Sequence, residues 1–210
     1  MARPDSQSAA IIGTGVQARM QIEALKIVIP GLKEVRAFDI RREAAEKFAG
    51  EMSEKFSLTV KAVDSAEVAV RDADIVVTVT VADEPIVMDA WMKRGSFFSA
   101  VGSYQEEEFA VVTSSDRVVV DGLEHVLHRE TPVIALMIKK GLIKKEEIIE
   151  LGQIVSDEKA GRAAPEERVF FSPIGMAIVD TCLSYKVYKL ALEMGIGKKL
   201  GLFGSGNQGV

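Results

Sequence analysis

A glycine-rich turn between an apolar run and a helix constrains this chain more than any other feature. The run at residues 9–12 leads into the pattern Gly13-x-Gly15-x-x-Ala18, and a segment that permits a helix follows. A second apolar run then ends in Asp39, about twenty residues past the turn. This order of strand, glycine turn, helix and acid is typical of a dinucleotide-binding unit.

Each small residue of the turn has a physical role. Gly13 lets the strand turn sharply, Gly15 leaves room for a pyrophosphate to approach the backbone, and Ala18 lets the helix pack closely on the strand. The helix N-terminus adds unpaired N–H groups and the positive end of its dipole. We therefore expect the pyrophosphate to lie against Gly13, Thr14, Gly15, Val16, Gln17 and Ala18.

A second glycine pattern, Gly204-x-Gly206-x-x-Gly209, fits the same rule letter by letter. Because Val210 is the last residue given, no helix and no acid follow this pattern. We reject it as a binding motif and expect residues 201–210 to form a flexible tail.

Asp39 is expected to accept hydrogen bonds from the hydroxyls of the adenosine ribose. Its charge repels a 2′-phosphate, which favours NAD over NADP. Arg41 and Arg42 follow the acid, and an arginine there can contact a 2′-phosphate or stack on adenine, so NADP stays open as an alternative. Asp39 can also cap the following helix, and the two roles are compatible.

The hydrophobic pattern predicts alternating strands and helices along the chain. The nearly continuous apolar run at 74–80 is typical of a strand buried on both faces, as in a parallel sheet covered by helices. We therefore predict an α/β fold with a doubly wound, mostly parallel sheet of Rossmann type. The predicted strands are 8–12, 34–39, 58–63, 74–80, 96–101 and 117–120, and the predicted helices are 16–28, 41–56, 64–71, 88–93, 123–129 and 174–194.

The carboxyl ends of two predicted strands carry further candidate cofactor contacts. In a doubly wound sheet these ends border the ligand crevice, and small residues there let the backbone approach the cofactor. A plain turn is the alternative at Gly102 and Ser103. The candidates are Thr78, Val79 and Thr80, which close the fourth strand, and Val101, Gly102 and Ser103, which close the fifth.

No residue of the sequence qualifies as the catalytic acid or base. Three consecutive acids, Glu106, Glu107 and Glu108, point in different directions on any element, so we expect them to be mostly solvated. Asp180 stands in a largely apolar helix, where it is either capped by backbone N–H groups or turned toward the crevice. The catalytic residues therefore stay unknown.

Metal binding is not expected. His125 and His128 lie three residues apart on one predicted helix, but no third ligand is evident. A solvated helix face explains the pair better.

Composition narrows the class of protein. The net charge is −5, and basic residues are interleaved with acids, which argues against a nucleic-acid binder. No apolar stretch has the roughly 20 residues of a membrane span, and the first residues are polar. The single cysteine, Cys182, lies in an apolar run and is expected to be a buried structural thiol. We expect a cytoplasmic protein.

Several blocks of the chain, taken with the turn, resemble the ornithine cyclodeaminase/mu-crystallin family. The forms Gly-Thr-Gly-x-Gln-Ala and Gly-Met-Ala-x-x-x-Asp are more specific than a general nucleotide motif. The blocks lie at residues 2–5, 12–18, 78–85, 91–95, 100–103 and 172–180.

The resemblance implies an NAD(P)-dependent oxidoreductase that transfers hydride between the nicotinamide and an amino acid or cyclic imino acid, as in alanine dehydrogenases or ketimine reductases. An ornithine cyclodeaminase, which makes proline and ammonia, is an alternative. Cyclodeaminases carry an acid soon after the glycine of the fifth strand, where this chain has Ser103-Tyr104-Gln105. That difference favours the dehydrogenase or reductase branch.

Family members also begin with a separate domain that binds substrate and forms the dimer. This chain resembles the cofactor domain without that part, so we expect it to be inactive in isolation and its full-length parent to be a homo-oligomer. A non-catalytic nucleotide-binding module is a further alternative. We expect a nucleotide domain at 1–155, a linker and helix at 156–200 that would pack on the missing domain, and the tail at 201–210.

Overall fold

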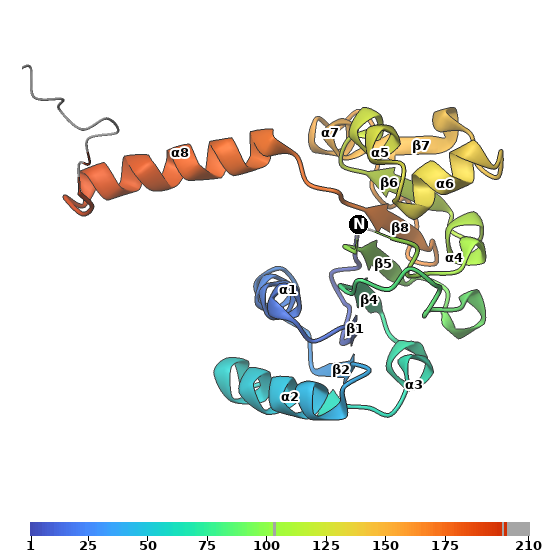
Figure 1. The fold of residues 1–210 in the computed structure, drawn as a ribbon, viewed down its shortest axis with the longest axis horizontal. Coiled ribbons are helices and arrows are strands. Elements are labelled where there is room, and N and C mark those ends of the chain that lie inside the picture. The colour runs from blue at the N-terminus through green and yellow to red at the C-terminus, as the bar shows by residue number, and fades with distance from the viewer. Residues whose placement is uncertain (103, 199, 201–210) are drawn as a thin grey trace, which may run out of the picture. The chain divides into compact units, whose positions relative to one another are not determined.

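The protein is built around one parallel sheet of eight strands, which confirms the predicted α/β class (Figure 1). The computed structural model describes residues 1–102, 104–198 and 200. The chain divides into two units, Met1–Ile174 and a second that begins at Gly175. The strands lie in the order β3-β2-β1-β4-β5-β8-β6-β7. The order reverses between β1 and β4, as in doubly wound nucleotide-binding sheets.

The elements of the sheet and of its covering layers have the following bounds. The strands are β1 (Ser8–Ile12), β2 (Glu34–Phe38), β3 (Thr59–Ala62), β4 (Ile75–Thr78), β5 (Phe97–Ala100), β6 (Arg117–Val120), β7 (Ile148–Glu150) and β8 (Val169–Ser172). The α-helices of this unit are α1 (Val16–Val28), α2 (Arg42–Phe56), α3 (Ala66–Val70), α4 (Phe109–Thr113), α5 (Leu123–Arg129), α6 (Val133–Lys139) and α7 (Leu151–Val155), and short 3-10 turns lie at Asp89–Trp91 and Lys145–Glu147.

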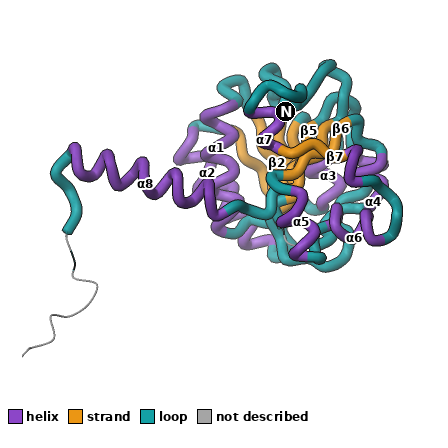
Figure 2. The backbone as a smooth tube through the Cα atoms, turned by 90° about the horizontal axis from the view of Figure 1, so that it is seen from above, coloured by secondary structure: helices purple, strands orange, loops and turns teal. Residues whose placement is uncertain are grey.

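Both faces of the sheet are covered because its central strands are apolar on both sides. Helices α1 and α2 lie on one side of the strands and α3 and α4 on the other (Figure 1). Ile11 of β1 belongs to the core under α1 and α2, whereas its neighbour Ile12 belongs to the core under α3 and α4. Figure 2 shows the strands enclosed by helices and loops. This double burial is what the apolar run of β4 predicts.

The first half of the fold is confirmed almost residue by residue. The predicted strand 8–12 and helix 16–28 have the bounds of β1 and α1. The sequence patterns did not predict α4, α6, α7 or β7, and the predicted helix 88–93 is a 3-10 turn at Asp89–Trp91. The structure also places β8, which follows a long loop, between β5 and β6. There Phe170 stacks on Phe98 of β5 at 5.3 Å between ring centroids.

The carboxyl ends of β1, β2, β4 and β5 finish level with one another. Ile12 pairs with Phe38 and with Thr78, and Thr78 pairs with Ala100. Hydrogen bonds continue the alignment past the strands, because the Gly13 amide donates to the Phe38 carbonyl at 2.8 Å. The turns that follow these strands are therefore held along one edge of the sheet.

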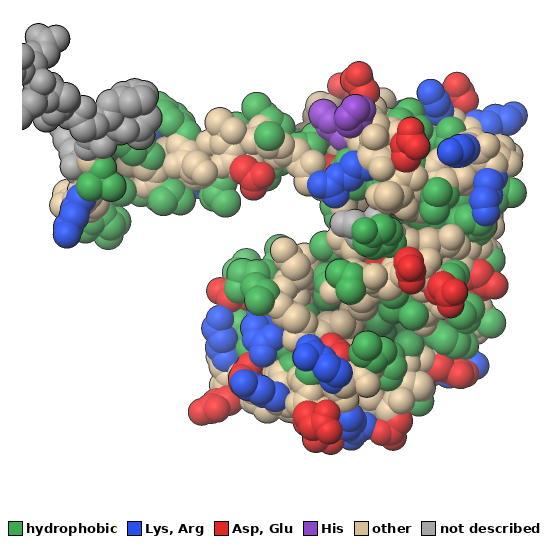
Figure 3. Space-filling model, viewed as in Figure 1, with side chains coloured by type: hydrophobic (Ala, Val, Ile, Leu, Met, Phe, Trp, Pro, Cys, Tyr) green, Lys and Arg blue, Asp and Glu red, His purple; other side chains and the backbone are tan. Residues whose placement is uncertain are grey.

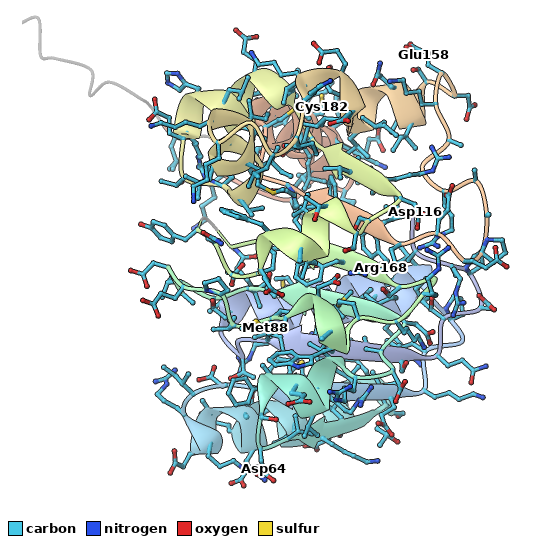
Figure 4. The ribbon with its side chains drawn as sticks, turned by 90° about the vertical axis from the view of Figure 1, so that its right-hand side faces the viewer. Asp64, Met88, Asp116, Glu158, Arg168 and Cys182 are labelled. Carbon is cyan, nitrogen blue, oxygen red and sulfur yellow. The ribbon has the colours of Figure 1, made fainter. Side chains whose placement is uncertain are left out.

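Ion pairs hold the amino ends of the strands. Asp74 accepts hydrogen bonds from Arg3, from Lys93 and from the Gln7 and Ser8 amides. Burial opposes the charge of Asp74, but the bond from Lys93 and those from the two amides outweigh it and lower its pKa to about 2. Asp116 and Arg168, labelled in Figure 4, lie together at the amino ends of β6 and β8, where the Arg168 amide donates to Asp116 Oδ2 at 2.7 Å.

The second unit contains the helix α8 (Ala177–Glu193), whose apolar side chains are exposed. Figure 3 shows hydrophobic side chains along it. Leu183 and Tyr185 are 60% and 64% exposed, and none of the residues of α8 is buried. The prediction that Cys182 is a buried thiol was wrong, because this side chain is exposed on α8. Asp180 is likewise exposed on α8.

Three expectations about domains stay predictions. These are the boundary after residue 155, the covering of α8 by a further domain, and the flexible tail at 201–210, which lies outside the described residues. Within the part of the chain that the structure describes, no helix is long and apolar enough to cross a bilayer.

The exposed apolar surface of α8 predicts self-association. We expect light scattering to give a mass above that of one 22.8 kDa chain, because side-by-side packing would remove these side chains from water. The double variant Leu183→Glu, Leu190→Glu places charges on one face of α8 and should restore the monomer mass. The control Ser184→Glu should self-associate like the unaltered chain, and a monomeric unaltered chain would contradict the prediction.

Candidate functional site

The turn after β1 requires glycine at its first position. Gly13 has a φ of +92°, a backbone conformation that residues with a side chain rarely adopt. A Cβ there would lie 2.8 Å from the Val79 carbonyl oxygen and 2.9 Å from the Thr80 methyl. The turn after β1 therefore packs directly against the turn after β4.

Gly15 is open where Gly13 is crowded. It is the N-cap of α1, has an ordinary φ of −73°, and a Cβ there would meet no atom within 4 Å. The N-cap has no side chain to bond the first turn of α1, and no described side chain accepts a hydrogen bond from its N–H groups, so they suit an anion. The first turn of α1 thus keeps the features of an anion site.

Asp39 is tied to the glycine turn. Its Oδ2 accepts hydrogen bonds from the Thr14 amide at 2.9 Å and the Thr14 hydroxyl at 2.8 Å, and its Oδ1 accepts one from the Arg41 amide at 3.0 Å. Partial burial opposes the charge of Asp39, but these bonds and the nearby Arg41 guanidinium outweigh it and lower the pKa of Asp39. The carboxylate is therefore charged at neutral pH. Arg41, not Asp39, is the N-cap of α2.

Arg19 on α1 is a contact that the sequence patterns missed. Its Nη1 donates to the Thr14 carbonyl at 2.8 Å and to the Gly15 carbonyl at 3.1 Å, and its Nη2 pairs with Glu51 at 2.6 Å. These bonds turn the Thr14 and Gly15 carbonyls toward the Arg19 guanidinium. A basic residue four or five positions after a glycine turn is the only signal that could have predicted this role.

A pocket of about 540 Å³ lies at the carboxyl ends of β1, β2 and β4. It is formed by the turn after β1, by the residues that follow β2, and by the loop after β4. Its lining residues are Ile12, Gly13, Thr14, Gly15, Phe38, Asp39, Ile40, Arg41, Val79, Thr80, Val81, Ala82 and Ile86. Pockets at this switch point of a doubly wound sheet are where nucleotides bind.

The structure brings part of the predicted cofactor set to this pocket. The predicted residues that line it are Gly13, Thr14, Gly15, Asp39, Arg41, Val79 and Thr80, whereas Val16, Gln17, Ala18, Thr78, Val101 and Gly102 do not line it. Ala18 is fully buried on the face of α1 that packs on the sheet, as close helix–strand packing requires. Val16 and Gln17 are exposed on the first turn of α1. Ser103 lies outside the described residues. The role of the whole set stays a prediction.

The acidic run after β5 corrects an expectation. Glu106 and Glu107 are 0% exposed, although the sequence predicted a mostly solvated run, and only Glu108 is exposed. Glu106 bonds the Thr80 amide and hydroxyl through Oε1, at 2.6 and 2.5 Å. Both oxygens of Glu107 lack a hydrogen-bond partner among the described residues. Burial and then the charge of Glu106 raise the pKa of Glu107 well above its ordinary value, so the folded state favours the protonated carboxyl.

The described residues contain no cluster of three or more potential metal-ligating side chains.

The Trp91 side chain packs at the edge of the core beside α3 and α4.

The fold and the glycine turn together define a Rossmann-type domain. Residues 1–195 match the model of the ornithine cyclodeaminase/mu-crystallin family, so the chain belongs to that family.

Two curated relatives match nearly the whole chain. It is 37% identical over 205 residues to a Delta(1)-pyrroline-2-carboxylate reductase of Bacillus cereus, covering 95% of this chain and 62% of the relative. It is 33% identical over 208 residues to an alanine dehydrogenase of Archaeoglobus fulgidus, covering 97% of this chain and 62% of that protein. The chain thus spans less than two thirds of the length of these relatives.

Solved structures of proteins with the same two names share the fold of this chain. A Delta(1)-pyrroline-2-carboxylate reductase of Thermococcus litoralis, solved with NADH and L-proline, superposes with a TM-score of 0.87 at 36% identity, covering 95% of this chain and 62% of that one. An archaeal alanine dehydrogenase dimer with bound NAD has a TM-score of 0.88 at 32% identity, covering 97% and 63%.

The contrast between the two glycines predicts different costs of adding a methyl group. We expect Gly13→Ala to lower the free energy of unfolding by about 2 kcal/mol, because it combines a positive φ with overlap on the Val79 carbonyl. Gly15→Ala should change it by less than about 0.5 kcal/mol, since its position is open. Urea unfolding measures both, and equal losses would contradict the assignment.

Glu107 predicts a pH-dependent cost to stability. The pKa of Glu107 is raised in the folded state, so its protonation stabilises the fold. This contribution to the free energy of unfolding is fully present below the ordinary pKa of 4.5 and is lost as the pH rises above that value. Glu107→Met removes the buried carboxyl and should raise the free energy of unfolding by about 1–3 kcal/mol at neutral pH, with a smaller gain in acid.

Chemical unfolding of the unaltered chain and of Glu107→Met across pH 4 to 8 measures this difference, a range that starts about where free glutamate titrates. The exposed neighbour serves as the control, and Glu108→Gln should follow the unaltered chain at every pH. A gain from Glu107→Met that is independent of pH would show that this carboxyl does not titrate with folding.

Proposed function

We propose that this chain is the NAD-binding region of an oxidoreductase that transfers hydride between nicotinamide and an amino acid or cyclic imino acid. The observation that carries the proposal is one pocket that joins an open glycine turn, an uncapped helix N-terminus and a charged Asp39. These three features match the pyrophosphate and the ribose of a dinucleotide.

The residues of the pocket fit the cofactor part by part. The space at Gly15 and the first-turn amides of α1 suit the pyrophosphate. Of the predicted set, Thr14 lines the pocket, Val16 and Gln17 belong to that first turn, and the buried Ala18 lets α1 pack closely on the sheet. Asp39 suits the ribose hydroxyls, since Oδ1 accepts one hydrogen bond among the described residues, from the Arg41 amide, and can accept a further one. Its charge favours NAD over NADP, although the Arg41 side chain is 77% exposed at the pocket and keeps NADP as an alternative.

The carboxyl ends of β4 and β5 are proposed to frame the nicotinamide. Thr78 ends β4 and Val79 and Thr80 come next in the sequence, whereas Val101, Gly102 and Ser103 come next after β5. The cofactor supplies the hydride, and the protein binds and orients it. We assign no catalytic acid or base.

The substrate class rests on relatives. Proteins named Delta(1)-pyrroline-2-carboxylate reductase and alanine dehydrogenase are 37% and 33% identical to this chain. We propose the same class, an amino acid or a cyclic imine, for the parent of this chain. Because the chain spans 62% of those relatives, we propose that residues beyond it complete the substrate site, that a further domain covers α8, and that the parent is a homo-oligomer in the cytoplasm.

Cofactor binding is tested by titrating NADH and NADPH into the chain and following their fluorescence. We expect NADH to bind more tightly than NADPH, because Asp39 is charged. Gly15→Ala should weaken NADH binding by at least about tenfold, since its methyl group occupies the approach of the pyrophosphate. Its unfolding curve should match that of the unaltered chain, which separates loss of binding from loss of fold.

No binding of either nucleotide at millimolar concentration would overturn the proposal, and tighter binding of NADPH would overturn the choice of cofactor. Turnover distinguishes the remaining functions. We expect the isolated chain to reduce cyclic imines with NADH weakly or not at all. Proline and ammonia formed from ornithine would instead identify a cyclodeaminase, and cofactor binding by a full-length parent without turnover would identify a binding module.

A further inference from the structure

Glu106 holds the first residue of the loop that follows β4. Its Oε1 accepts hydrogen bonds from both the Thr80 amide and the Thr80 hydroxyl, at 2.6 and 2.5 Å. The two residues are 26 positions apart, and Glu106 is 0% exposed. Because one buried oxygen accepts from both donors of Thr80, it fixes the backbone and the side chain of Thr80 together.

The backbone of Glu106 holds the other end of the same loop. Its carbonyl oxygen accepts hydrogen bonds from the Ile86 amide at 2.9 Å and the Val87 amide at 3.2 Å. The Glu108 amide then donates to the Val87 carbonyl at 3.0 Å and continues the pairing. One residue thus binds the loop 80–87 at its start through its side chain and at its end through its main chain.

This loop forms one wall of the nucleotide pocket. Val81, Ala82 and Ile86 line the pocket together with Thr80. The Thr80 hydroxyl donates to Glu106 and accepts from the Ala82 amide at 3.0 Å, so the orientation set by Glu106 is passed two residues along the wall. The Thr80 methyl meanwhile lies 2.9 Å from the place that a Cβ of Gly13 would take. The wall and the glycine turn are therefore fitted to each other through Thr80.

The turn after β5 is shaped around the same carboxylate. A Cβ at Gly102 would overlap the Glu106 carboxylate, so only glycine fits there. The second oxygen of Glu106, Oε2, makes no hydrogen bond of good geometry with any residue that the structure describes. The Thr78 hydroxyl and the Gly102 amide nevertheless lie close enough to offset part of the rise that burial causes in the pKa of Glu106. Glu106 therefore joins the turns that follow β4 and β5.

We propose that Glu106 is a positioning residue for the cofactor pocket. It clamps both ends of the loop 80–87 and so holds this wall at the distance from the glycine turn that a bound dinucleotide requires. The inference rests on the proposed function, because it names the residue that prepares the same pocket. Because this wall is ordered before binding, the cofactor does not have to meet the entropy cost of ordering it, and the affinity for the cofactor is higher.

The test compares NADH affinity in variants of the intact chain. Glu106→Gln keeps the shape but loses the charge, and its amide group then sits beside the Gly102 amide, where both groups are donors. Thr80→Val keeps the methyl group and removes the hydroxyl. We expect each to raise the NADH dissociation constant about tenfold. Thr80→Ser keeps the hydroxyl and should bind NADH more tightly than Thr80→Val, because the bonds to Glu106 and Ala82 are kept.

Glu107→Gln is the matched control. Glu107 is as buried as Glu106 and adjacent to it, but its side chain makes no bond to the loop. We expect this variant to bind NADH within about twofold of the unaltered chain. Equal weakening by Glu106→Gln and Glu107→Gln would overturn the proposal, because it would reflect a general disturbance of the core.

Amide hydrogen exchange reports on the clamp without any cofactor. In Glu106→Gln the Thr80 and Ala82 amides should exchange at least about tenfold faster, while the Val35 and Ala37 amides of β2 exchange at the unaltered rate. Unchanged exchange at Thr80 and Ala82 would overturn the clamp. Failure of the unaltered chain to bind NADH would instead overturn the proposed function, and Thr80→Val decides the question if Glu106→Gln does not fold.

Discussion

The contact between two turns at neighbouring strand ends is the constraint on which this structure depends. Gly13 lies so close to the Val79 carbonyl and the Thr80 methyl that no side chain fits between them. This contact is made where the strand order reverses, so the helix after β1 lies on one face of the sheet and the connection after β4 leads to the other. The pocket exists because the two turns diverge from this point, with Asp39 holding the first turn and Glu106 the second.

Local signals predicted the half of the fold that contains this contact. The run 8–12, the glycine turn and the helix 16–28 each carry a pattern of their own, and their order fixes the β1-α1-β2 unit. The patterns failed where elements are short or depend on distant partners. Helix α4 has five residues and β7 has three, too few for a periodicity, and β8 is placed in the sheet only by contacts with β5 and β6.

The candidate site divides in the same way. The glycines and Asp39 could be predicted because their roles follow from backbone geometry and spacing. The role of Glu106 could not be predicted, because glutamates are rarely buried and most residues of a run of three acids are exposed to water. What makes Glu106 a buried acceptor is the loop 80–87, which comes earlier in the chain and closes over it. Arg19 was missed for a related reason, since its partners are carbonyl groups, which carry no sequence signal.

The position of β8 has a consequence for how the chain assembles. In the described sheet β6 bonds only β7 and β8, and β5 bonds only β4 and β8. Of the described strands, the one that comes latest in the chain, β8, is therefore the one that joins the two halves. Until residues 169–172 insert, the nascent chain carries two open sheet edges that face each other without a partner. Such edges are prone to wrong pairing, so late closure makes this step the point where synthesis is most exposed to aggregation.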